Sequence, residues 1–488
     1  MKRFLLCFVY VLFFGGYEKI LGQTSQATED GTYEYSGTIP VLFVETENHT
    51  PVLEKGEYLK ATYYLKTFGW KGYEDVASPE KMDSCYIRCR GNWSFLGYDK
   101  KPYKLKLEKK ESLLGMSKNK HFVLLNQAGG SPKYMDTPVG NEVSRMLNLQ
   151  WTPEERPVEV VVNGEYMGLY CLTEHVRVGK NRVDIVEQDD NETDINKISS
   201  GGWLVELDFY EDTPQIRIDV SDTDLIEYGE KGIQKFWLTV HSPEELSDLQ
   251  YEYLTAQFQH IKDAVFNEDK SSTEWEDLID MEDLIKYTMQ AQITTRMEAF
   301  LGSTFIYKKD GNSKWCFGPV WDLEWTLYYC KSNIFTWDEN NYSGISILHE
   351  IAKFPRFQDE LRNKWQDIRG QRDHLHVFID SICEDMREAV KHDAHRWPKY
   401  GNPQIDECGE KAKELIDYRW AWLDEQLRNT SSTAVQQINK TDEAKSLYNL
   451  SGVLVCDFTN INDLYRRNIP KGVYIVKSQS RSKKIILH

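Results

Sequence analysis

The chain has 488 residues, of which 40% are hydrophobic and 13% aromatic, and its formal net charge is −18. This length suits a large domain with a smaller one, and the apolar content is enough for a buried core. The acidic balance argues against a nucleic-acid partner, because phosphate backbones select basic surfaces. The 14 tryptophans keep a carbohydrate-binding function open.

The first 22 residues predict an export signal. A basic pair, Lys2 and Arg3, precedes an apolar run over residues 4–14, which is too short to span a bilayer, and cleavage is plausible near Gly22 or Ala27. An uncleaved membrane anchor is the alternative. No later segment is apolar enough to predict a transmembrane helix. We therefore expect an exported protein that is periplasmic, displayed at the cell surface or secreted.

Strand patterns dominate the first half of the chain, apart from one helical pattern over residues 136–147. Strands are predicted at residues 39–45, 59–68, 84–92, 103–109, 157–163 and 165–173, and the last two form a hairpin around Asn163 and Gly164. Helical periods dominate the second half, at residues 242–266, 281–292, 355–368, 374–392 and 407–427, interrupted by strands at 305–308 and 314–317. The predicted fold class is α+β.

A polar linker over residues 429–441 separates a small β-tail, residues 442–488, from the rest. The tail resembles the C-terminal β-tails of exported Bacteroidetes proteins, some of which are sorting signals. A small stabilising β-unit without an address function is the alternative. Eight cysteines follow the signal segment without zinc-type spacing, so disulfides are compatible with export but their connectivity is not predicted.

Two strand segments carry cations at alternating positions. Arg88, Arg90 and Asn92 share one face of the first, and Lys104 and Lys106 share one face of the second. If the two strands are neighbours, these side chains form a cradle for phosphate, which arginine and lysine bind well. The alternative is a half-exposed sheet with its charged residues pointing outward.

Two carboxylates follow an aromatic strand that ends in Gly318 and Pro319. Asp322 and Glu324 are two residues apart, so an extended backbone would point both to the same side. Both then reach one hard cation, which takes oxygen ligands and often bridges to phosphate. An edge strand with two solvated acids is the alternative.

Together these stretches resemble the CotH family of atypical secreted protein kinases. The landmarks are IRCRGN (residues 87–92), KPYKLK (101–106), PVEVVVNGEYMGLY (157–170) with Glu174, and FGPVWD (317–322). The resemblance implies a distant kinase-like fold over residues 30–428. It also implies ATP with Mg²⁺ or Mn²⁺ as cofactors, and phosphoryl transfer to Ser or Thr of a partner protein that the sequence does not name.

The resemblance also assigns roles by position. It makes Lys106 the phosphate-binding lysine, Glu174 the carboxylate that orients it, and Asp322 the metal ligand and a catalytic residue. Glu298 takes the place of the catalytic carboxylate and Glu324 that of a second metal ligand. Lys104, Arg88 and Arg90 belong to the nucleotide-binding face, so all these side chains are expected around one cleft between the two halves of the chain.

Four charged positions depart from the family pattern. Glu298 and Glu324 stand where relatives have Asp, Arg296 stands where they have Asn, and Asp136 stands where they have Arg. Because Mg²⁺ demands near-ideal octahedral geometry, the longer glutamates predict slow turnover or a nucleotide-binding pseudokinase. A surface module that binds glycan or protein without nucleotide chemistry is the remaining alternative.

Overall fold

The structure is a computed structural model. It describes residues 34–208, 214–219, 235–297, 299, 302–337, 347–428, 445–449, 453–458, 469–470, 472–477 and 482–487. The predicted signal peptide, the predicted linker and Glu298 lie outside these residues. Within them, no helix combines the length and apolarity that crossing a membrane requires.

Seven strands of the N-terminal half close into a barrel in the order β1-β2-β3-β4-β5-β7-β6. All neighbours are antiparallel except β1 and β6, which are parallel. Inward side chains such as Ile87, Leu105 and Phe122 form the barrel core. The strands are β1 (Val41–Thr46), β2 (Leu59–Lys66), β3 (Asp83–Cys89), β4 (Tyr103–Glu111), β5 (Asn119–Leu125), β6 (Glu155–Val162) and β7 (Glu165–Glu174).

A second, five-stranded antiparallel sheet has the order β12-β11-β8-β10-β9. Its strands are β8 (Trp203–Leu207), β9 (Gln215–Asp219), β10 (Lys235–Ser242), β11 (Thr304–Lys308) and β12 (Trp315–Phe317). One face, with Trp203, Ile306 and Trp315, packs into the helical core. The other face, with Leu204 and Phe305, packs against the segment that leaves the barrel after β7.

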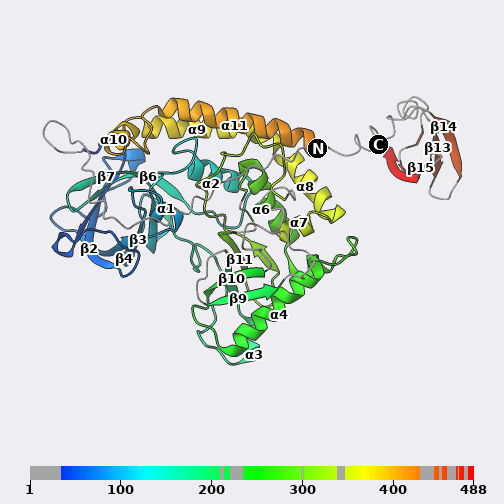
Figure 1. Ribbon diagram of the computed structural model, residues 1–488, viewed down its shortest axis with the longest axis horizontal. Helices are drawn as coiled ribbons and strands as arrows, with labels where there is room; N and C mark the ends of the chain where they lie inside the picture. The colour runs from blue at the N-terminus through cyan, green and yellow to red at the C-terminus, as the bar shows by residue number, and fades with distance from the viewer. Residues whose placement is uncertain are drawn as a thin grey trace, which may run out of the picture.

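Helices surround this sheet and connect it to the barrel. Figure 1 shows α9 and α11 side by side along one edge of the molecule, with the barrel at one end. The longer helices are α2 (Asp136–Met146), α4 (Asp248–Val265), α6 (Met281–Thr294), α8 (Pro355–Ile368), α9 (Arg372–Met386), α10 (Ala389–Arg396) and α11 (Ile405–Gln426). The short ones are α1 (Trp93–Leu96), α3 (Ile195–Ser200), α5 (Glu274–Leu278) and α7 (Ile347–Ile351).

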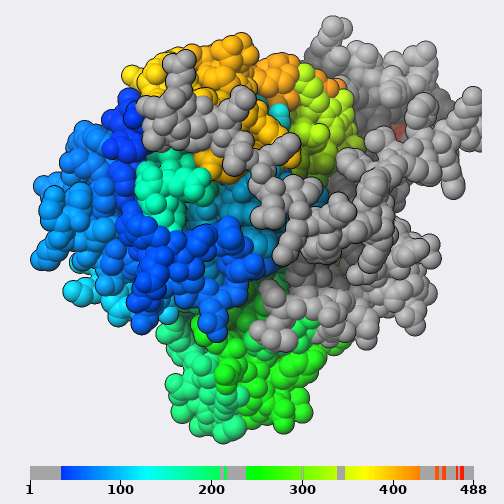
Figure 2. Space-filling view, turned by 60° about the vertical axis from the view of Figure 1, so that its left-hand side comes forward, coloured from blue at the N-terminus to red at the C-terminus, as the bar shows by residue number. Residues whose placement is uncertain are grey.

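The barrel borders both the five-stranded sheet region and the C-terminal helices when the molecule is viewed from another side. In Figure 2 the barrel strands, in blue, border the green segment of the five-stranded sheet and α4 below and the orange C-terminal helices above. The barrel is therefore in contact with both other parts of the described domain. A side chain on the outer face of the barrel can in consequence be covered by another part of the chain.

The α+β class is confirmed, and several element bounds are corrected. The predicted helix over residues 374–392 is two helices, α9 and α10. The helical pattern predicted from residue 242 begins only at Asp248, because β10 runs to Ser242 and a short loop joins it to the helix cap at Ser247. Strands β5, β8, β9 and β10 were not predicted, nor was closure of the barrel. Closure depends on the long-range pairing of β1 with β6 and β7 with β5, which no local pattern encodes.

The C-terminal residues form a four-stranded antiparallel sheet in the order β14-β13-β15-β16. Its strands are β13 (Lys445–Asn449), β14 (Leu454–Phe458), β15 (Gly472–Lys477) and β16 (Ser482–Leu487). Leu447, Tyr474 and Val476 are buried in it. The cysteines of the described residues, Cys456 of this sheet among them, are free thiols.

Candidate functional site

The predicted cations lie on the outer face of the barrel. Strands β3 and β4 are neighbours, and Arg88 stands directly opposite Lys104. Strand alternation buries Leu105 and Leu107 inside the barrel and turns Lys104 and Lys106 outward. Lys104 is half-buried, whereas Lys106 is exposed. The two lysines therefore share a face but not an environment.

Lys104 is surrounded by other cations. Burial, together with Arg177, Arg88 and Arg90, lowers the pKa of Lys104 to about 8. Among the described residues, no carboxylate lies within ion-pair distance of it, and Glu244 opposes the shift only from farther away. A cluster of cations with no close anion is typical of a site that binds an anionic ligand.

Two histidines extend this basic face without adding charge. Burial and Arg177 lower the pKa of His121 to about 3, and burial and Lys104 hold the pKa of His175 well below its ordinary value. Both rings are therefore neutral at physiological pH. His121 lies opposite Lys106 in the sheet, and the His175 ring meets Trp321 edge-on at 6.3 Å between centroids.

Arg90 connects this face to the predicted acidic segment. Its guanidinium lies 5.6 Å from the centre of the Trp321 ring. Burial lowers the pKa of Arg90, whereas the nearby carboxylates of Asp322, Glu206 and Glu324 raise it. The outer face of β3 and β4 and the segment after β12 therefore meet, with cations on one side and carboxylates on the other.

The Asp322 side chain is exposed, and its hydrogen bond with Ser303 is long. Its Oδ2 accepts a hydrogen bond of 3.3 Å from the Ser303 hydroxyl. The backbone is not extended here as predicted: Asp322 has a φ of 55°, in the left-handed region, and lies beyond the end of β12. Alternation along a strand therefore does not set the directions of Asp322 and Glu324, and that interpretation is corrected.

Glu324 is directed at a glycine pair in the loop after β5. A Cβ atom on Gly129 would come within 1.6 Å of Glu324 Oε1, so any side chain at that position would displace the Glu324 carboxylate. The nearby Tyr98 hydroxyl and Gly129 amide favour the charged form of this carboxylate and act to lower its pKa. Burial and the charge of Asp322 nevertheless raise the pKa of Glu324 to about 7, so Glu324 is partly protonated at neutral pH and binds a cation less well than a fully ionised carboxylate.

Asp136 is a second buried carboxyl group beside Glu324. It is 7% exposed, and its Oδ2 lies against Gly130. Burial and then Glu324 raise the pKa of Asp136 well above its ordinary value, and Lys133 opposes that rise. The Lys133 ammonium donates to the carbonyl oxygens of Ala128 and Gly129, which fixes the same loop. The loop with Gly129 and Gly130 therefore brings Asp136 and Glu324, which are far apart in the sequence, close enough to affect each other's charge.

The family model described as CotH kinase protein matches residues 87–423, more than two thirds of the chain. This chain belongs to the CotH family. A comparison with curated proteins found no match. The matched range starts in β3, ends in α11, and contains every residue of the cationic face and the acidic segment described above.

The CotH resemblance pairs Glu174 with Lys106, but the structure does not bring them together. Glu174 lies opposite Phe122 in the β7–β5 register and is buried at the inner end of the barrel, whereas Lys106 points outward. Glu174 pairs instead with Arg182, with 3.6 Å between Arg182 Nε and Glu174 Oε1. Glu174 also accepts hydrogen bonds from the Ser117 hydroxyl and the Glu154 amide. That Glu174 and Lys106 point to opposite faces of the barrel was not predicted from the sequence.

Of Arg296 and Glu298, the structure describes only Arg296. Its side chain is buried over the Tyr287 ring, 4.8 Å from the ring centre. Its Nε and Nη2 have no hydrogen-bond partner among the described residues. Arg296 is therefore a fixed buried cation in this CotH chain. Glu298 lies outside the described residues, so its catalytic role stays a prediction.

The described residues contain no group of three or more His, Cys, Asp or Glu side chains placed to hold a metal ion. Mg²⁺ is commonly held by one or two carboxylates together with substrate phosphates. Asp322, exposed and close to Glu324, fits that limited role once phosphate supplies the other oxygens. Arg177, His121 and His175 were not predicted from the sequence, although alternation along β5 and along the segment after β7 could have placed them on the Lys104 face.

Proposed function

We propose that this CotH protein is exported, binds ATP with Mg²⁺ or Mn²⁺ between the barrel and the five-stranded sheet, and transfers phosphate to Ser or Thr of a partner protein. One observation carries the nucleotide site: among the described residues Lys104 and Arg90 form no ion pair, and Arg90 brings this cationic face close to the exposed Asp322. Membership of the CotH family supports a kinase-like function in general. Export rests on the charged and apolar start of the sequence.

The cationic face supplies the phosphate contacts in this proposal. The Lys104 ammonium donates hydrogen bonds to phosphate oxygens, and the negative charge of phosphate stabilises its protonated form. The planar Arg90 guanidinium donates two parallel hydrogen bonds that match the geometry of phosphate. Trp321 and His175 cover the site and limit water. Asp322 holds the divalent ion, which neutralises phosphate charge. Positioning and charge neutralisation are most of what phosphoryl transfer needs.

Turnover should be slow. A glutamate in place of aspartate moves a carboxylate by roughly one C–C bond, about 1.5 Å. Misplacement by about 1 Å costs on the order of a hundredfold in rate. Glu324 also has its pKa raised to about 7, so it is partly protonated at neutral pH. We expect Mn²⁺ to support more activity than Mg²⁺.

Two lysines of one strand make a matched test of nucleotide binding. Calorimetric titration with ATP and Mg²⁺ or Mn²⁺ should give at least about tenfold weaker binding for Lys104→Met, because it removes the half-buried cation. Lys106→Met removes the same charge from an exposed position and should change the affinity less. The reverse ranking would return the phosphate-binding role to Lys106. No binding by the wild type would favour a module without nucleotide chemistry.

Phosphate incorporation separates a kinase from a pseudokinase. Three proteins are compared: the wild type, Asp322→Ala, and a triple variant that combines Arg296→Asn, Glu298→Asp and Glu324→Asp. Each is incubated with labelled ATP, and the label is measured in substrate protein and in the CotH protein itself. Wild-type activity that disappears in Asp322→Ala supports the proposal. Activity only in the triple variant shows a pseudokinase. Activity that survives the loss of Asp322 contradicts its metal role.

A further inference from the structure

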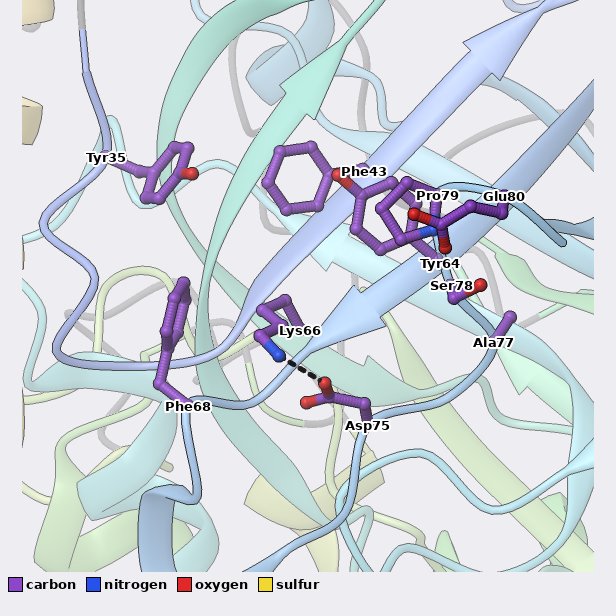
Figure 3. Close-up of a pocket in the computed structure, with 10 residues that line it drawn as sticks. All are labelled: Tyr35, Phe43, Tyr64, Lys66, Phe68, Asp75, Ala77, Ser78, Pro79 and Glu80. Atoms are coloured by element: carbon purple, nitrogen blue, oxygen red, sulfur yellow. Dashed lines mark hydrogen bonds and ion pairs between the residues drawn. The ribbon is translucent and has the colours of Figure 1, made fainter.

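A hollow of about 390 Å³ lies on the outer face of β1 and β2 (Figure 3). These are different barrel strands from those that carry Lys104 and Arg90. Its lining combines aromatic rings with charged and hydroxyl groups: Tyr35, Phe43, Tyr64, Lys66, Phe68, Asp75, Ala77, Ser78, Pro79 and Glu80. Cavities of this size hold small organic ligands. Nothing in the proposed nucleotide chemistry uses it.

Four rings surround the hollow. Phe43 and Tyr64 face each other across the β1–β2 pair and stack at 4.3 Å between centroids, with 5° between their planes. Tyr35 meets Phe43 edge-on at 5.5 Å. Phe68 lies 6.2 Å from Tyr35 and is 44% exposed. In Figure 3 the Tyr35 and Phe68 rings stand on one side and the stacked pair on the other.

Phe68 is held in an unfavourable backbone conformation. Its φ is 53°, in the left-handed region that bulky residues avoid, and Ala77 on the opposite wall has a φ of 61°. The preceding residue is fixed, because the Thr67 amide donates to Asp75 Oδ1 at 2.8 Å and the Thr67 hydroxyl to the Tyr73 carbonyl at 2.8 Å. Strain kept to present an exposed ring is typical of a binding site.

The polar groups of the hollow disfavour an anionic ligand. Lys66 and Asp75 form an ion pair of 2.6 Å, so their charges cancel while each keeps further hydrogen-bonding capacity. Glu80, the other charged residue of the lining, is a carboxylate that repels anions and accepts hydrogen bonds from hydroxyl groups. Burial, and then the nearby Tyr35, raise the pKa of Tyr64, so the two tyrosine side chains lie close together. Ring faces beside hydroxyls and a neutral ion pair match a molecule with both C–H faces and hydroxyl groups.

We propose that this hollow binds a neutral saccharide of one or two sugar rings. The C–H face of a pyranose stacks on an aromatic ring, and its hydroxyls hydrogen-bond to Lys66, Asp75 and the tyrosines. A proline-rich peptide needs a longer open groove lined by aromatic rings. Here the segment from Asp75 to Glu80 encloses one side, which favours the shorter ligand.

The test separates loss of the ring from loss of the fold. Phe68→Gly removes the ring and at the same time relieves the left-handed strain, so it should not destabilise the protein. Tyr64→Ala removes half of the stacked pair. Tyr251→Ala is the matched control, because Tyr251 is 42% exposed on α4. The probes are neutral gluco-, manno-, xylo- and N-acetylglucosamine oligomers, measured by calorimetry with the whole exported chain, and a proline-rich peptide.

At least one neutral oligomer should bind the wild type, and Phe68→Gly and Tyr64→Ala should each weaken that binding at least about tenfold. Tyr251→Ala should leave the affinity within about twofold of the wild type, and Phe68→Gly should not lower the melting temperature. Asp322→Ala should leave saccharide binding unchanged, which separates this site from the nucleotide site. Absence of saccharide binding, equal binding by Phe68→Gly, or binding of the peptide alone would overturn the proposal.

Discussion

Two lysines of one short segment, Lys100 and Lys104, lie in contrasting regions. Lys100 is fully buried where the barrel meets α10, and its ammonium donates to Asp393 Oδ1 at 2.6 Å and to the Leu169 carbonyl at 2.7 Å. Lys104 is half-buried between the barrel and the sheet, and its nearest charged groups are arginines. Lys100 therefore pairs with a carboxylate of the fold, whereas Lys104 has no carboxylate within ion-pair distance among the described residues.

The contrast distinguishes structural charge from functional charge. Asp393 also accepts from the Leu169 amide at 2.8 Å and the Tyr134 hydroxyl at 3.1 Å, so the junction with α10 is satisfied without any ligand. Around Lys104, one Arg88 nitrogen, Nη1, donates to the Lys55 and Gly56 carbonyls, and Arg177 reaches Glu244 only at 3.5 Å. The remaining positive charge near Lys104 is available to a ligand.

The largest expected effect is at the satisfied junction. Lys100→Met leaves Asp393 buried without its cation and should lower the free energy of unfolding by about 3–5 kcal/mol. Calorimetric unfolding measures it. Lys71→Met is the control, because it breaks an exposed ion pair with Asp385 and should cost about 1 kcal/mol or less. Equal losses in both variants would contradict the structural role of Lys100.

Replacing Arg90 should lower ATP affinity rather than stability. Arg90→Met removes a cation whose carboxylates are not within ion-pair distance, so ATP affinity should fall about tenfold, or about 1.4 kcal/mol, with little change in stability. Arg145→Met is the matched control, because Arg145 pairs with Glu155 at 2.8 Å and should lose stability instead. Calorimetry with ATP and thermal unfolding separate the two results. A large stability loss in Arg90→Met would show that Arg90 is structural.

The pH dependence of stability follows from the pKa of Lys104, lowered to about 8 from 10.5. Below pH 8 the ammonium is charged in both states and its repulsion weakens the fold. Between about pH 8 and 10.5 the unfolded chain holds more protons, so this contribution raises stability as pH rises. ATP affinity should fall over the same range as the ammonium is lost. Lys104→Met should flatten both trends in unfolding and binding measured from pH 7 to 10.

The smallest effect concerns Glu244, the carboxylate that opposes the pKa shift of Lys104. Glu244→Gln should make the cationic face more positive and tighten ATP binding about two- to threefold, at a stability cost below about 1 kcal/mol, because the Arg177 pair is exposed. Glu245→Gln is the neighbouring control and should have less effect. Weaker ATP binding in Glu244→Gln would mean that the carboxylate helps to position the nucleotide.

Local pattern was sufficient for the strands that carry the cationic face. The alternation of residues 103–107 predicted which lysines point outward, and the neighbouring strand with Arg88 lies where the sequence suggested. Glu174 shows the limit of the same rule. Its neighbour His175 points toward Trp321, so a step of one residue changes the face of the barrel and, with it, the cation that Glu174 contacts.

The sequence by itself determined the α+β class, the landmark segments of the CotH family and the outward faces of single strands, because period-two and period-3.6 patterns are local. Only the tertiary structure decided that the barrel closes, that Asp322 adopts a left-handed backbone, and that Glu324 turns to Gly129 beside Asp136. It also decided that Lys100 pairs with an anion 293 residues away, whereas Lys104 has no ion-pair partner among the described residues. Such outcomes depend on contacts between segments distant in the chain, which no local pattern encodes.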